Sequence, residues 1–280
     1  MANKILLYTM QQHRDWFYDD FVIETAYGSP DSCIWNGNRP SVGRIQRPTE
    51  IAGIFGMYRD FGIIYRLTFT NFLLNQWHLY DTYGNTIARI GNGFGGYVMV
   101  SLPMMALYFR NNYPNLKVCW STTTEFPEGI KTVNTLSERE LVVLPYEYNN
   151  KWELLEQLEH PENVEVLINE KCIDNCPRRR EHWARNNAIN LMMFDGDSPC
   201  FFGNAVDRTN VTHLVPRNKL GEYTARGINH FKIEGRLNNY SVRMAYLDYF
   251  VLPERQQEYM AFFDECSRTN FGLGWPVPQQ

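Results

Sequence analysis

Two cysteines at the end of an apolar run have the clearest capacity for chemistry in this chain. Cys172 and Cys176 are separated by three residues and follow the segment VEVLIN (164–169), which predicts a short and mostly buried strand. Loops that leave strand ends often carry functional groups, and two thiolates at this spacing can reach one metal ion or cluster. The pair therefore indicates a metal site. Cysteine also packs as a small buried hydrophobic residue, so a structural role is the alternative.

A basic segment follows the two thiols. It consists of three arginines (178–180) and His182. Their positive charge is expected to lower the pKa of the thiols and to offset the charge of a cluster. His182 is expected to pack against Trp183 or to hydrogen-bond within the loop rather than to bind metal, because lone histidines are mostly structural. The histidines form no zinc-binding pattern.

Composition limits the class of protein. The chain has 280 residues, 44% of them hydrophobic and 21% charged, which is typical of a globular protein with a substantial core. A net charge of -4 provides no overall attraction to nucleic acid or anionic membranes. The N-terminal run KILLYTM is too short for a signal sequence, and no segment is long enough to span a membrane. We therefore expect a cytoplasmic protein with no membrane partner, whose six cysteines are reduced thiols or ligands.

Short β-type runs alternate with segments that favour helices. The predicted strands are 21–27, 63–71, 96–101, 116–122, 141–145, 164–169, 211–216 and 230–235. The predicted helices between or after them are 48–59, 83–91, 103–112, 152–159 and 237–251. This order predicts an α/β fold of the TIM-type (β/α)8 barrel class, either regular or incomplete. We expect one domain over 1–280, in which Pro253 separates the last barrel helix from a C-terminal helix and tail at 252–280.

In such a barrel the carboxyl ends of the strands share one face, where barrel enzymes have their active sites. The segments 121–125 and 169–176, the loop with Cys33, and Gly235 with Arg236 are expected to open on that face. Cys200 lies in the sequence DGDSPCFFG, whose composition predicts a loop. A helix over 254–265 can return Cys266 to the same face.

Two segments resemble a known family. The segment 213–250 contains KIEGR (232–236) before a helix, and the segment 96–123 has the order strand, helix, strand. Both are similar to the corresponding regions of the U32 peptidase-like, or collagenase-like, family. The resemblance covers most of 62–250 and is strongest from Val164 onward.

The resemblance implies a barrel that in several branches binds an iron–sulfur cluster, here expected to be 4Fe–4S, and that modifies RNA bases or ubiquinone by hydroxylation. It implies metal ligation by Cys172, Cys176 and Cys200. Cys266 and Cys33 compete for the fourth position, and Cys266 is preferred. The cysteine spacing departs from the common family pattern, which puts the fourth ligand in question.

The same resemblance suggests the other site residues. Glu234 and Arg236 are assigned to catalysis, with Glu234 as a proton or charge buffer, and Arg178 and His182 to substrate binding. The expected substrate is a small aromatic molecule or a base of RNA. There are two alternatives. One is a U32-type peptidase without a cluster, and the other is a noncatalytic barrel that is stabilised by a metal and binds a protein partner. A radical SAM motif is excluded because Arg179 stands where its third cysteine is needed.

Overall fold

The computed structural model describes residues 2–37, 39, 41–170, 172–193, 211–234 and 239–269. These residues form two compact units. The larger unit spans the described parts of Ile23–Leu214 and Gly221–Lys232. The smaller unit is built from the described parts of Met1–Val22, Val215–Leu220 and Ile233–Gln280. The expectation of one domain over 1–280 stays a prediction.

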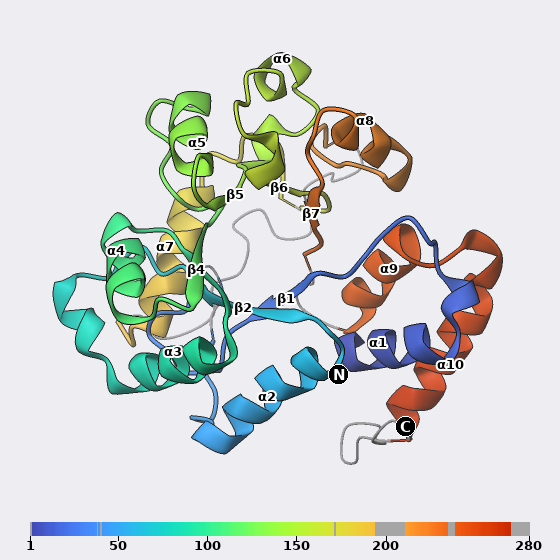
Figure 1. The fold of residues 1–280 in the computed structure, drawn as a ribbon, viewed down its shortest axis with the longest axis horizontal. Coiled ribbons are helices and arrows are strands. Elements are labelled where there is room, and N and C mark those ends of the chain that lie inside the picture. The colour runs from blue at the N-terminus through green and yellow to red at the C-terminus, as the bar shows by residue number, and fades with distance from the viewer. Residues whose placement is uncertain are drawn as a thin grey trace. The chain divides into compact units, whose positions relative to one another are not determined.

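The larger unit is built on one parallel sheet whose seven strands neighbour each other in chain order. The strands are β1 (Thr25–Gly28), β2 (Ile64–Phe69), β3 (Gly96–Val100), β4 (Leu116–Trp120), β5 (Leu141–Val143), β6 (Val164–Leu167) and β7 (His230–Lys232). The sheet curls, and helices follow its outer side (Figure 1). The predicted α/β class is therefore confirmed as a partial, curled barrel, and the described residues do not close an eight-stranded one.

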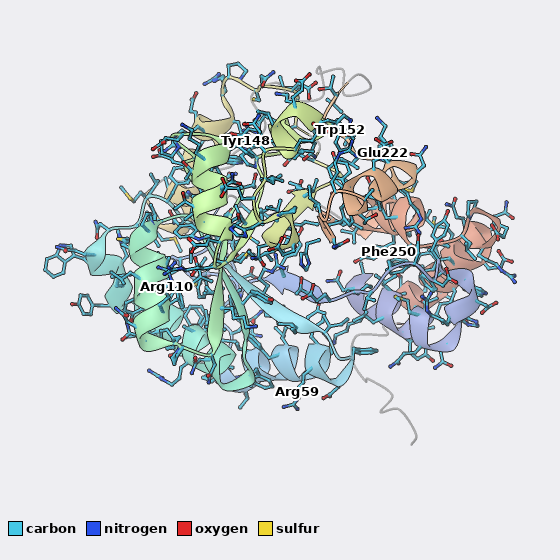
Figure 2. All side chains as sticks on the ribbon, turned by 45° about the horizontal axis from the view of Figure 1, so that its top comes forward. Arg59, Arg110, Tyr148, Trp152, Glu222 and Phe250 are labelled. Carbon is cyan, nitrogen blue, oxygen red and sulfur yellow. The ribbon has the colours of Figure 1, made fainter. Side chains whose placement is uncertain are left out.

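Helices connect the successive strands. They are α2 (Pro48–Asp60), α3 (Thr82–Phe94), α4 (Pro103–Asn112), α5 (Ile130–Ser137), α6 (Trp152–Leu155), α7 (Arg179–Asn190) and α8 (Leu220–Thr224). The first three agree with the predicted helices. The helix predicted at 152–159 ends after one turn, at Leu155. Its first residue, Trp152, labelled in Figure 2, packs on Tyr223 of α8 with ring centroids 4.9 Å apart. Helices α5 and α7 were not predicted.

The run 211–216, predicted as a strand, is irregular in the structure. Two side-chain amides bind its backbone carbonyls. Asn149 Nδ2 donates to the carbonyl of His213 (2.8 Å), and Asn150 Nδ2 donates to those of Thr212 (2.7 Å) and Leu214 (3.0 Å). Since these carbonyls are already satisfied, the segment needs no sheet neighbour. The prediction of a strand there, with His213 in it, is wrong.

The two faces of the sheet differ in chemistry. On the outer face, Leu67 of β2 packs under α3, where a Cβ on Gly91 would lie 3.1 Å from the Leu67 Cδ1 atom. On the inner face, the neighbouring residue Arg66 reaches Glu165 of β6. Successive side chains of a strand point to opposite faces, so one strand supplies an apolar contact outside and a charge inside.

The smaller unit contains α1 (Ala2–Gln12), α9 (Asn239–Tyr249) and α10 (Gln256–Arg268), so the helices predicted near 237–251 and 254–265 are present. Phe17 pairs through its backbone with Val251, and its ring meets that of Tyr259 edge-on at 5.8 Å. Nowhere in the described part of the chain is a helix both long and apolar enough to cross a bilayer.

Candidate functional site

The predicted thiol pair lies at the carboxyl end of β6. The Cys172 thiol is within hydrogen-bonding reach of the Cys176 thiol and of the Tyr146 hydroxyl. Burial raises the pKa of Cys172 to about 11, against the lowering effect of the Tyr146 hydrogen bond. The expectation that neighbouring arginines lower the pKa of this thiol is therefore wrong. Without a bound metal, Cys172 is a neutral thiol near pH 7.

Each of the three arginines is paired with a carboxylate, although Arg178 still interacts electrostatically with Cys176. Arg178 pairs with Glu181 (2.7 Å), Arg179 with Glu147 and Arg180 with Glu125. The Arg179 guanidinium also lies over the rings of Tyr146 (4.2 Å) and Trp183 (5.0 Å). The basic segment is thus neutralised locally. Arg178 is half-exposed and His182 lies in the first turn of α7, and their assignment to substrate binding stays a prediction.

The cysteine loop is tied to the segment that follows the undescribed residues 194–210. Asp174 in the loop accepts a hydrogen bond from the Thr212 amide (2.8 Å) and faces Nδ1 of buried His213. His213 Nε2 lies 3.0 Å from the carbonyl oxygen of Glu170. Although burial opposes it, the hydrogen bonds from Thr212 and His213 hold the pKa of Asp174 below its usual value. An ionised Asp174 therefore fixes the loop that carries both thiols.

Helix α7 reaches across several loops at the carboxyl ends of the strands. Near its start, Arg180 pairs with Glu125 after β4. Further along, the Asn187 carbonyl accepts from Asn71 Nδ2 after β2 (3.2 Å), and Asn190 Nδ2 donates to the Asn36 carbonyl (2.8 Å). The helix thus brings together the segments 121–125 and 169–176 and the loop of Cys33, as predicted. It does so through buried asparagines rather than an apolar stripe.

The remaining predicted site residues lie in several other parts of the chain. Cys33 is fully buried in the larger unit, and burial raises its pKa to about 12. Cys266 is a buried residue of α10 in the smaller unit, and Glu234 is buried just after β7. Cys200 and Arg236 lie outside the described residues. Within the described ranges, no group of three or more His, Cys, Asp or Glu side chains is arranged to hold a metal ion.

A second polar group lies inside the curled sheet and was not predicted. We call it the interior cluster, and it consists of Tyr27, Arg66, Met99, Cys119, Glu165 and Lys232, from β1, β2, β3, β4, β6 and β7. Arg66 Nη1 lies 2.7 Å from Glu165 Oε2, and both side chains are almost fully buried. Although burial opposes it, Arg66 lowers the pKa of Glu165, so this carboxylate is ionised. The signal available in the sequence was the presence of charged residues, Arg66, Glu165 and Lys232 among them, within short strands.

Comparison with known proteins supports the fold assignment. No protein-family model matches the sequence, and a search of curated proteins finds no match. Among solved structures, the chain is similar to a U32 peptidase with a TM-score of 0.54 and 12% sequence identity. The match covers 81% of this chain and 90% of the other. This likeness shows that the chain has a fold of the U32 peptidase type.

Proposed function

We propose that this chain is an enzyme built on a U32-like partial barrel, with an iron–sulfur cluster held in part by Cys172 and Cys176. The observation that carries this proposal is the contact between the two thiols at the carboxyl end of β6. Carboxyl ends of parallel strands are where barrel enzymes place their chemistry. The fold similarity to a U32 peptidase supports the barrel architecture of this proposal.

The raised pKa of Cys172 suits a metal ligand better than a reactive nucleophilic thiol. Metal binding requires deprotonated cysteines and competes with protons, so a thiol with a pKa of about 11 would be ionised only when metal binds. The Tyr146 hydroxyl could then donate a hydrogen bond to the Cys172 sulfur, as outer groups do for many metal ligands. Two ligands come from this loop. Cys200 would be the third, and Cys266 or Cys33 would complete the set.

When bound, the cluster would supply electron transfer for a hydroxylation-type change to a nucleobase or other aromatic substrate. Arg178 and His182 would contact the substrate, and Arg236 would orient an anionic group. Glu234, which is buried directly after β7, would hold or release a proton. The substrate would be a small molecule or RNA.

The test is anaerobic purification followed by measurement of iron, acid-labile sulfide and the visible spectrum. Wild type should carry stoichiometric iron and sulfide, and Cys172→Ala and Cys176→Ala should lose both. Cys119→Ala is the matched control because Cys119 is also buried but lies in β4, away from the loop. Iron that is absent from wild type after anaerobic reconstitution, or equally retained in all three variants, would contradict the proposal.

A peptidase without a cluster is the second candidate. It is favoured by the solved structure of similar fold, which is described as a U32 peptidase. Iron-free protein that hydrolyses a peptide library, and loses this activity in Glu234→Gln, would establish it. Iron-free protein without hydrolysis that captures a defined protein partner would instead support the noncatalytic binding barrel.

A further inference from the structure

The interior cluster places a lysine amine beside a sulfur atom and an aromatic ring. Lys232 Nζ lies 3.4 Å from the Met99 sulfur and 4.1 Å from the centre of the Tyr27 ring. The carboxylate of the cluster, Glu165, is already bound to Arg66 at 2.7 Å. The amine therefore has soft and aromatic neighbours, while the carboxylate is engaged elsewhere.

The electrostatic surroundings favour the neutral amine. Burial lowers the pKa of Lys232 from 10.5 to about 8, with Arg66 and Arg39 adding to the effect and Glu165 and Cys119 opposing it. At pH 7.5 about one quarter of such an amine is unprotonated, compared with about one in a thousand for an ordinary lysine. A lysine made neutral by burial and nearby cations is the kind that forms Schiff bases.

Lys232 also retains some solvent exposure. Lys232 is only partly buried, and so are Tyr97 and His230, which lie on the same inner face at the amino ends of β3 and β7. Arg66 and Arg39 act on the amine against the carboxylate of Glu165. Nearby, Glu24 lies 3.2 Å from His230 and Lys117 stands on the same face, so the cations outnumber the carboxylates by one. A small anionic reactant would be attracted to this position.

We infer that Lys232 is a covalent amine site for small anionic carbonyl compounds, with 2-oxo acids as the ligand class. The lone pair of Nζ forms a bond to the carbonyl carbon, and the carbonyl π electrons move to oxygen. That oxygen takes one proton from the attacking nitrogen and one from solvent, and leaves as water when the C=N bond forms. One carbonyl compound, one neutral amine and one proton thus give one protonated imine and one water, with no oxidant or reductant. Glu165 keeps Arg66 in place and, as a carboxylate, stabilises the protonated imine.

This site is separate from the cysteine loop, and it is tested without reference to iron. Wild-type protein is incubated with glyoxylate and sodium cyanoborohydride, which reduces an imine to a stable secondary amine, and modified lysines are located by peptide mass spectrometry. Lys232 should be labelled at least about tenfold faster than Lys117, an exposed lysine on the same face of the sheet. The labelling rate at Lys232 should rise with pH to a midpoint near 8.

Two variants and one second probe complete the experiment. Lys232→Arg keeps the charge but cannot form an imine, so labelling at that peptide should vanish while iron and sulfide content stays as in wild type. Lys117→Arg should leave Lys232 labelling unchanged. Propionaldehyde, which has no anionic group, should label Lys232 more slowly than glyoxylate. The inference would be overturned if labelling follows solvent exposure alone, or if Lys232 is not labelled in folded wild-type protein. Either result would count whatever the iron content proves to be.

Discussion

The buried pair Arg66–Glu165 allows a sharp test of what holds the curled sheet together. Replacing Glu165 with Gln removes the charge opposite Arg66, whose side chain is 2% exposed. The guanidinium keeps weaker partners, which include Thr25 Oγ1 at 3.1 Å, the Cys119 sulfur at 3.7 Å and the ring of Tyr97. Leaving one charge of a buried pair uncompensated costs about 3–5 kcal/mol. We expect Glu165→Gln to lower the free energy of unfolding by that amount, as measured by urea denaturation.

The double variant Arg66→Met with Glu165→Leu separates the cost of an unpaired charge from the loss of packing. Replacing both ions by apolar residues of similar size is often neutral or stabilising by about 1–4 kcal/mol. We therefore expect the double variant to be clearly more stable than Glu165→Gln. Glu156→Gln, which breaks an exposed pair with Arg226, is the control and should cost about 0–1 kcal/mol. A Glu165→Gln loss no larger than the control, or a double variant as unstable as the single one, would refute the reasoning.

Three further results are expected. Lys232→Met should be more stable than wild type near pH 7. The difference should shrink between pH 8 and 10.5, because the lowered pKa of Lys232 in the folded state makes wild-type stability rise over that interval. A difference in stability that does not depend on pH would argue against the lowered pKa. Asn149→Leu should cost about 1–3 kcal/mol in thermal or urea unfolding, since the carbonyls of Leu167 and His213 lose their donor, and no loss would show that other donors replace it. In metal-free protein, alkylation of Cys172 by iodoacetamide should be slow at pH 7 and still rising at pH 10, and a plateau below pH 9 would contradict its raised pKa.

Much of the architecture could be predicted from local patterns. Strands such as GYVMV (96–100) and VEVL (164–167) are short apolar runs, and their alternation with helices favours a parallel sheet. The segment 211–216 was misjudged because its apolar residues resemble a strand, while the amides that bind its carbonyls come from Asn149 and Asn150. Helix α7 was missed because its buried side is made mostly of asparagines, which have low helix propensity. Its formation depends on loops far away in the chain.

The candidate site, like the fold, could be predicted only in part from the sequence. The spacing of Cys172 and Cys176 and their place after β6 could be predicted from the sequence, and the two thiols do meet. The raised pKa of Cys172 could not be predicted, because it comes from burial in the folded chain. The carboxylates that pair with Arg180 and Arg179, Glu125 and Glu147, also lie 55 and 32 residues earlier in the chain. Sequence proximity alone suggested unpaired positive charges, and the folded chain pairs each of these arginines with a carboxylate.

The sequence by itself determined the order of strands and helices, the barrel-like class and the thiol pair, because these depend on residue types a few positions apart. Tertiary structure alone decided which charges meet. Arg66, Glu165 and Lys232 stand on three different strands, and only the curl of the sheet brings them into one interior. Electrostatic effects depend on distance in space and on burial, and neither quantity is contained in the spacing of residues along a chain.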